Sequence, residues 1–308
     1  MLLSLALPSN NLSGNITEEL FAPFAFLAQL DLSDNPLLTF TSFSSSSELE
    51  LLSLRGCGMD TLNAFFERNS IFENLSVLLL DGNALSASLD SVNFKTFAPK
   101  LELFWAGGGN NKLRGGVENL MRDLRGTLRQ LSLPGNDLEG KMGPAGVLEF
   151  LDLSHNPGLQ SKFSDLLEMD QDQHPNATAL THLVLASAGI VGRVAESELL
   201  ALPAIQVLRL ENNRLWGQFP FHALPVLPKL TVFNANNNSI LSPTPAAASP
   251  GSDFPSILTE RFSVCNAGYF YSDGGSCLSC LGEKNQRHED AGPSSLDVCF
   301  QQREENRR

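Results

Sequence analysis

The chain has 308 residues, a formal net charge of −13 and an apolar content of 42%. This apolar fraction, with charged residues at 18%, is typical of an ordered protein and excludes a disordered one. The acidic balance argues against nucleic acid or an anionic membrane as a partner, because both select a basic face. No run of about 18 apolar residues occurs, so the sequence predicts no membrane-spanning segment.

A repeating unit is present from the first residues onward. Its marker positions are Leu2, Leu5, Leu7, Asn10, Leu12, Gly14 and Ile16. A signal peptide is not indicated, because no basic segment precedes the apolar residues. No capping segment precedes the unit either, and an uncapped repeat exposes apolar core. The sequence therefore predicts that the chain is an N-terminally truncated piece of a longer protein.

The same frame returns along the chain and is most complete at Ile205–Phe219, IQVLRLENNRLWGQF. Its units start at Leu2, Leu27, Leu49, Leu75, Leu101, Leu128, Leu148, Leu180, Ile205 and Leu230. The pattern L-x-x-L-x-L-x-x-N resembles the leucine-rich-repeat family, and the tail L-x-G-x-I resembles its plant-type repeats. The resemblance implies an α/β fold, a right-handed solenoid (horseshoe) with a parallel concave sheet and a convex side of 3₁₀ and short helical turns. It also implies a second short strand at each L-x-G tail. The second, third, fourth and seventh units lack the Gly of this tail.

A column of asparagines closes the turn of most units: Asn10, Asn35, Asn83, Asn111, Asn136, Asn156, Asn213 and Asn238. Such a tight turn leaves buried backbone polar groups without partners, and a stacked side-chain amide satisfies them. Cys57 takes the same place in the third unit, where we expect a structural buried thiol. Ala188 cannot form these hydrogen bonds, so the eighth unit is predicted to be a local weak point.

The repeat pattern covers residues 1–241, and residues 242–262 are a linker rich in Pro, Ser and Ala. In the following segment, 263–300, the run CNAGYFYSDGGSCLSC resembles the extracellular cysteine-rich modules of tumour-necrosis-factor and ephrin receptors. The segment is too small for its own core, which favours disulfides among Cys265, Cys277, Cys280 and Cys299. A zinc site is the alternative, and three disulfide connectivities are open. The charged tail 301–308 is expected to be disordered.

Side chains between the strand leucines are expected to point outward on the concave sheet. One lane reads Asp31, Ser53, Leu79, Trp105, Ser132, Asp152, Val184, Arg209 and Asn234, and its neighbour includes Arg55, Asp81 and Glu211. These positions vary while the leucines do not, which is typical of a broad recognition surface. Trp105 is either an exposed anchor or a ring folded back on its neighbours. The predicted ligand contacts are Asp31, Arg55, Asp81, Trp105, Asp152, His155, His182, Arg209, Glu211 and Asn234.

Asp152, His155 and His182 invite comparison with a catalytic triad, but no nucleophile lies at a strained turn such as G-x-S-x-G. We therefore predict a non-catalytic recognition ectodomain, without cofactor or metal, that binds a protein, peptide or glycan. The cysteine cluster and the sequons favour a secreted or cell-surface location, with Asn74 and Asn176 as predicted glycosylation sites. The alternatives are an intracellular (cytoplasmic) scaffold and an accessory region of a larger receptor kinase or GTPase.

Overall fold

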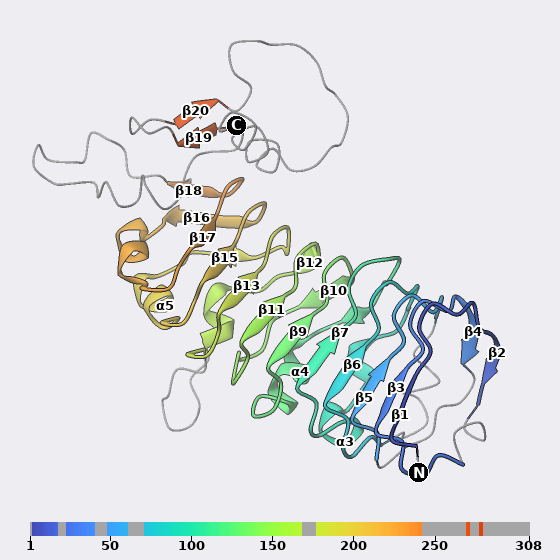
Figure 1. Ribbon diagram of the computed structural model, residues 1–308. Helices are drawn as coiled ribbons and strands as arrows, with labels where there is room; N and C mark the ends of the chain where they lie inside the picture. The colour runs from blue at the N-terminus through green and yellow to red at the C-terminus, as the bar shows by residue number, and fades with distance from the viewer. Residues whose placement is uncertain are drawn as a thin grey trace, which may run out of the picture.

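The computed structural model describes residues 2–17, 23–40, 48–60, 71–167 and 177–241, with the backbone of 269–271 and 277–279. Ten short parallel strands form one sheet in the order β1-β3-β5-β6-β7-β9-β11-β13-β15-β17, which runs the length of the molecule (Figure 1). One strand falls in each predicted unit. Their bounds are β1 Ser4–Ala6, β3 Gln29–Asp31, β5 Leu51–Ser53, β6 Val77–Leu79, β7 Leu103–Trp105, β9 Gln130–Ser132, β11 Phe150–Asp152, β13 His182–Val184, β15 Val207–Arg209 and β17 Val232–Asn234.

Each strand is three residues long, and its middle residue points into the core. Leu30, Leu52 and Leu78 pair in register and are at most 2% exposed. Because side chains alternate along a strand, the first and third residues then point away from the core. Burial of one leucine side chain contributes roughly 1.5–3 kcal/mol, so the repeated leucines hold the sheet in place.

Strands of two to five residues form a second set of sheets after the asparagine turns. The pairs and triplets are β2 (Ser13–Ile16) with β4 (Leu37–Phe40), β8 (Arg114–Gly115) with β10 (Asp137–Gly140) and β12 (Gly158–Leu159), and β14 (Val191–Gly192) with β16 (Arg214–Gln218) and β18 (Ser239–Leu241). The predicted strand at each L-x-G tail is thus confirmed. The second, seventh and tenth units also form this strand without the L-x-G tail, as β4, β12 and β18. Our reading of the tail was too narrow, because a ladder of backbone hydrogen bonds does not require particular side chains.

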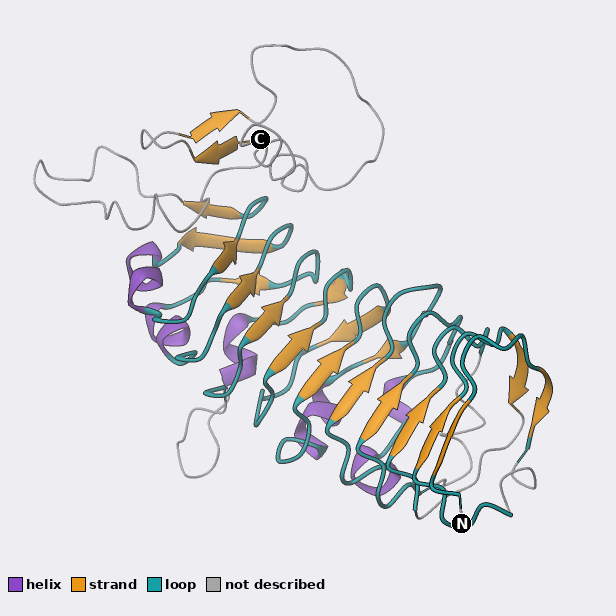
Figure 2. Cartoon of the chain, in the orientation of Figure 1, coloured by secondary structure: helices purple, strands orange, loops and turns teal. Residues whose placement is uncertain are grey.

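Helical turns lie on the side opposite the ten-stranded sheet (Figure 2). They are η1 Leu89–Ser91, α3 Phe94–Phe97, α4 Glu118–Asp123, η2 Phe163–Leu167, α5 Glu196–Leu200 and η3 Phe221–Val226. Phenylalanines from these turns enter the core, where the rings of Phe72 and Phe97 meet edge to face at 5.4 Å. No helix in the described part of the chain has the length and apolarity to cross a membrane.

The asparagine column forms a ladder that joins neighbouring units. Asn156 Nδ2 donates to the carbonyls of Leu133, Leu153 and Ser154 at 2.9–3.1 Å, and its Oδ1 accepts from Leu138 N at 3.2 Å. Two of these partners belong to the preceding unit. A single buried amide therefore connects the turn of its own unit to the turn before it.

Cys57 occupies the same position in the third unit and is a buried free thiol, as predicted. Its Sγ donates to Leu32 O at 3.1 Å, in the preceding turn. Burial is the main cause that raises the pKa of the Cys57 thiol, and the charges of Asp34 and Asp31 raise it further. The neutral thiol is therefore the form that the fold favours.

The eighth unit keeps part of the ladder in spite of Ala188. The backbone N–H groups of Ala188 and Ile190 both donate to Asn213 Oδ1 at 3.0 Å, and Asn213 Nδ2 donates to Leu185 O. The next unit therefore satisfies this turn. Ala188 has no side-chain amide that could donate to a carbonyl of the seventh unit. We therefore expect the weak point to lie at the contact between the seventh and eighth units, and not within the turn of the eighth.

Beyond Leu241 the structure describes only the backbone of an antiparallel pair, β19 (Tyr269–Tyr271) and β20 (Cys277–Ser279). The linker 242–262 and the tail 301–308 lie outside the described residues. So do Cys265, Cys280, Cys299 and the side chain of Cys277, and the disulfide-rich module stays a prediction. Asn176 also lies outside the described part.

Candidate recognition surface on the ten-stranded sheet

The side chains that point away from the core on the ten strands form what we call the open face. Strand pairing places Trp105, Ser132, Asp152 and Val184 side by side in one lane across β7, β9, β11 and β13. The lane continues to Arg209 and Asn234 on β15 and β17. The predicted positions are thus brought together, but not all of them offer surface. Ser53, Glu211 and Asn234 are buried, with 4%, 5% and 8% exposed.

A further lane on the open face was missed by the sequence analysis, except for His182. It consists of the first residue of each strand. Its apolar members are the half-buried Leu51, Val77, Leu103, Phe150 and Val207 and the exposed Val232. The sequence contains the information needed to predict this lane, because the residues before and after an inward-pointing leucine both point outward in a strand. The sequence analysis considered the residue after that leucine and the one two positions further on, and it named only His182 among the residues before the leucine. The missed lane adds Leu51, Val77, Leu103 and Phe150 to the apolar surface at the centre of the sheet.

Three side chains of the open face and Arg55, two residues past the end of β5, form a continuous line. We call it the central row: Arg55, Trp105, Phe150 and His182. The Arg55 guanidinium lies 5.3 Å from the centre of the Trp105 ring. The Trp105 and Phe150 rings are 6.4 Å apart, and Phe150 and His182 are 5.7 Å apart. The row crosses six adjacent strands from β5 to β13, a span of about 24 Å at the usual strand spacing.

Trp105 is folded back on its neighbours, which decides between the two orientations left open by the sequence. Asp81 holds Arg55 in place, since its Oδ2 accepts from Arg55 Nε at 3.0 Å while its Oδ1 accepts from Gly107 N at 3.0 Å. The indole Nε1 is buried and has no hydrogen-bond partner among the described residues. An unpaired buried donor costs roughly 1–3 kcal/mol. The packing of the Trp105 ring against its neighbours must therefore outweigh this cost.

The side chains that suggested a triad are engaged with other groups. Asp152 Oδ1 accepts from Ser154 N and Ser154 Oγ at 2.9 and 2.7 Å. His182 Nδ1 lies 2.9 Å from Thr181 Oγ1, and His155 is exposed at a turn where its φ is 56°. Within the described ranges, no hydrogen bond joins any two of Asp152, His155 and His182. The geometry is that of separate surface positions.

Asp31 repeats the arrangement of Asp152 at the other end of the sheet. Its Oδ1 accepts from Ser33 N at 3.0 Å and from Ser33 Oγ at 2.6 Å. Its strand begins with Gln29 where the strand of Asp152 begins with Phe150. Asp31 therefore lies outside the central row.

At the C-terminal end of the open face, Arg209 Nε donates to Glu211 Oε1 at 2.8 Å. Glu211 Oε2 is buried without a partner among the described groups. Arg209 and Glu211 thus pair with each other. Only Arg209 is half-exposed, so it is the member of the pair that a ligand can reach.

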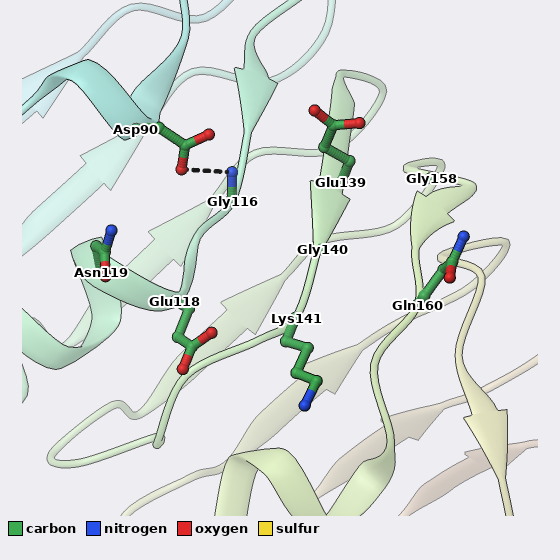
Figure 3. A pocket seen from close by; sticks show the side chains of 9 residues that line it. All are labelled: Asp90, Gly116, Glu118, Asn119, Glu139, Gly140, Lys141, Gly158 and Gln160. Atoms are coloured by element: carbon green, nitrogen blue, oxygen red, sulfur yellow. Dashed lines mark hydrogen bonds between the residues drawn. The ribbon is translucent and has the colours of Figure 1, made fainter.

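The flank formed by β8, β10 and β12 carries a hollow of about 590 Å³ that the sequence analysis did not single out (Figure 3). Its lining is polar and rich in carboxylates: Asp90, Gly116, Glu118, Asn119, Glu139, Gly140, Lys141, Gly158 and Gln160. Asp90 Oδ1 accepts from Gly116 N at 3.0 Å, and Glu118 pairs with Arg122. Neighbouring Gly115 has a φ of 82°, and a Cβ there would collide with Asp90. The hollow is shaped by contacts within the fold and has no aromatic anchor.

Trp216 and the predicted glycosylation site Asn74 lie away from the strands of the open face. Trp216 is 48% exposed on β16, and the Arg193 guanidinium stacks 4.1 Å from its ring centre. Asn74 is half-buried, and its Oδ1 accepts from Lys100 Nζ at 2.6 Å. Glycosylation of Asn74 stays a prediction.

The chain matches no family model. No curated protein matches it either. Among solved structures, it is similar to a TDR receptor, with 17% identity, a TM-score of 0.60, and coverage of 86% of this chain and 47% of that one. It is also similar to a plant ice-binding protein (24% identity, TM-score 0.52, 80% and 76% covered). A third is the plant peptide hormone receptor RGFR1 in complex with RGF2 (20% identity, TM-score 0.52, 86% and 44% covered).

The chain thus spans less than half the length of the two receptors that it matches. At these identities the likeness concerns the fold. Together with the repeats and the long parallel sheet, it shows that the chain has a leucine-rich-repeat solenoid fold.

Proposed function

We propose that this chain is a non-catalytic recognition module that binds an extended peptide or protein segment on the open face of its ten-stranded sheet. The observation that carries the proposal is the central row. Trp and Arg are favoured as binding anchors, and here they meet at the middle of a broad surface. The side chains around them vary from strand to strand, as a surface that recognises one particular ligand requires.

The scaffold beneath the row is suited to rigid presentation. Leu78, Phe104 and Leu131 are buried under it, and ladder asparagines fix most of the turns beside it. A rigid surface loses little conformational entropy on binding. A span of about 24 Å corresponds to about seven residues of extended chain. An extended segment of that length is therefore the natural occupant.

The ligand class draws support from one structural neighbour. RGFR1 is described as a plant peptide hormone receptor and was solved in complex with RGF2. A peptide is accordingly the ligand class that we favour over a glycan.

The test is selection of binders from a random twelve-residue peptide library displayed on phage, followed by affinity measurement on variants. We expect Trp105→Ala and Phe150→Ala each to weaken the selected peptides by about tenfold or more, since a buried aromatic anchor contributes at least that much. Trp216→Ala on the flank is the matched control and should leave affinity unchanged. Circular dichroism and urea unfolding of each variant confirm that it is folded.

The proposal is overturned if no selected peptide depends on Trp105 or Phe150, or if Trp216→Ala abolishes binding while the other two variants do not. Binding would then lie elsewhere on the solenoid.

We further propose a secreted or cell-surface location for the module. The sequons and the cysteine cluster support it. Peptide mass spectrometry after enzymatic deglycosylation in heavy-oxygen water tests it, combined with blocking of free thiols. A labelled Asn74 or Asn176 together with paired Cys265, Cys277, Cys280 and Cys299 is the expected result. Unmodified asparagines with four free thiols would favour the intracellular scaffold instead.

A further inference from the structure

The open face contains one arrangement of an aromatic ring, a carboxylate and a guanidinium that is complete within the fold. Arg55 lies over the Trp105 ring at 5.3 Å, and its Nε donates to Asp81 Oδ2 at 3.0 Å. The guanidinium is planar, so it can stack on a ring and donate to a carboxylate at the same time. Arg55 is thus held by an aromatic ring, that of Trp105, and by a carboxylate, that of Asp81.

Phe150 and Asp152 offer the first two parts of the same arrangement. They are the outward residues of β11 and lie on the same face, about 7 Å apart along the strand. Phe150 is in ring contact with both Trp105 and His182. In the described part of the chain, no arginine or lysine forms an ion pair with Asp152.

The Asp152 carboxylate has acceptor capacity to spare. Its Oδ1 is taken by Ser154 N and Ser154 Oγ, and both carboxylate oxygens carry lone pairs for further donors. Among the described groups, none donates to Oδ2. Asp152 is half-buried beside the rings, where a charge-assisted hydrogen bond is stronger than in open water.

We propose that Phe150 and Asp152 form an arginine subsite, in which a guanidinium of the bound segment stacks on Phe150 and donates to Asp152 Oδ2. The acidic balance of the chain, with a net charge of −13, adds long-range attraction for a basic ligand. This inference rests on the proposed peptide recognition and names the residue that the ligand must carry.

Asp31 supplies a matched control for the carboxylate. It has the same sequence context and the same hydrogen bonds to a serine two residues on, but it lies outside the central row. Asparagine is a conservative replacement at both positions. Asn234, in the same lane, accepts from Asn236 N through its Oδ1 at 3.1 Å, so the amide preserves the turn. Asp152→Asn and Asp31→Asn therefore change the net charge equally and alter the same kind of serine contact at two different places on the sheet.

The experiment uses the random peptide library, selected in parallel on the wild-type chain, on Asp152→Asn and on Asp31→Asn. For the tightest wild-type peptide, the arginine is then replaced by citrulline, which keeps the planar shape and removes the charge. We expect arginine to be enriched on the wild type and on Asp31→Asn but not on Asp152→Asn. Citrulline should weaken binding to the wild type by about tenfold and cause no further loss on Asp152→Asn, as in a double-mutant cycle.

Failure of the subsite is distinguishable from failure of peptide recognition. If selected peptides depend on Trp105 and Phe150 but contain no required arginine, or if Asp31→Asn weakens them as much as Asp152→Asn does, the subsite is wrong and recognition stands. If no peptide depends on Trp105 or Phe150, both are wrong.

Discussion

Two turns of this chain have nearly the same sequence, LDLSDNP at residues 30–36 and LDLSHNP at 151–157, and yet they border different surfaces. In both, an aspartate accepts from the backbone and side chain of a serine, and an asparagine enters the ladder. Beside the first turn lie Gln29 and Ser53, whereas the second follows Phe150 in the central row. The local motif thus builds the scaffold, and the neighbouring lane decides what a unit can recognise.

The largest difference between the two turns is expected from their ladder asparagines. Asn156→Ala leaves the carbonyls of Leu133, Leu153 and Ser154 and the N–H of Leu138 without their side-chain partner, in a fully buried place. We expect a loss of about 3 kcal/mol in the free energy of unfolding, measured by urea denaturation. Asn35→Ala should cost less, because its partners Asn10 and Leu12 lie in the first unit and are partly solvated. Equal costs would contradict the distinction between a central and a peripheral turn.

The rings that distinguish the second turn give the next effect. Phe150→Ala removes contacts with both Trp105 and His182, and we expect it to lower the free energy of unfolding by about 1–2 kcal/mol. Gln29→Ala changes the equivalent position of an exposed lane and should stay within about 0.5 kcal/mol. Urea unfolding of both variants is the measurement. A Phe150→Ala variant as stable as the wild type would show that the central row is not a packed unit.

The first turn can be probed through Cys57, whose thiol donates to Leu32 O and whose pKa is raised by burial and by Asp34 and Asp31. The unfolded thiol loses its proton near its ordinary pKa, while the folded thiol keeps it to higher pH. Stability from this group is therefore complete below the unfolded pKa, and falls as pH rises towards the folded pKa. The slope is at most about 1.4 kcal/mol per pH unit.

Urea unfolding at pH 7 to 10 checks the prediction, with Cys57→Asn as the control that retains a ladder side chain. The stability of the wild type relative to Cys57→Asn should fall as pH rises. A difference that is independent of pH would mean that the thiol titrates alike in both states.

The smallest effect concerns the two serines. Ser154→Ala removes one hydroxyl donor from Asp152, and a cost of about 0.5–1 kcal/mol is expected. Ser33→Ala should cost a few tenths more, since Ser33 Oγ also lies 2.7 Å from Ser53 Oγ. Urea midpoints measured side by side resolve the order. If Ser154→Ala is the more costly of the two, the serine pair does not stabilise the first turn.

Much of the scaffold could be predicted from the sequence, because the residues that build it recur at fixed offsets in each unit. The leucines at fixed offsets predicted the strands, and the asparagine column predicted the ladder, with Cys57 correctly placed in it. The strands β4, β12 and β18 were not expected, because backbone pairing leaves no side-chain signature. The lane of Phe150 was missed, except for His182, although period-two alternation requires it.

The candidate site was predicted only in part, since its contacts depend on side-chain directions that a pattern does not contain. Trp105 reaches Phe150 two strands further along the sheet, and Arg55 reaches Trp105 from the opposite side. Glu211 and Asn234 were proposed as contacts, but the fold itself buries them. The repeat pattern predicts which residues point outward. Contacts between the side chains of neighbouring lanes then decide which of these residues remain accessible to a ligand.

The most direct test of the account is the fluorescence of Trp105 as the sole tryptophan. The chain has two tryptophans, and Trp216→Phe on the flank leaves Trp105 as the only reporter. Titration with a selected peptide, whose saturation is established by calorimetry, should change the Trp105 emission and reduce its quenching by acrylamide. Unchanged emission and quenching at saturation would place binding away from the central row and contradict the central claim.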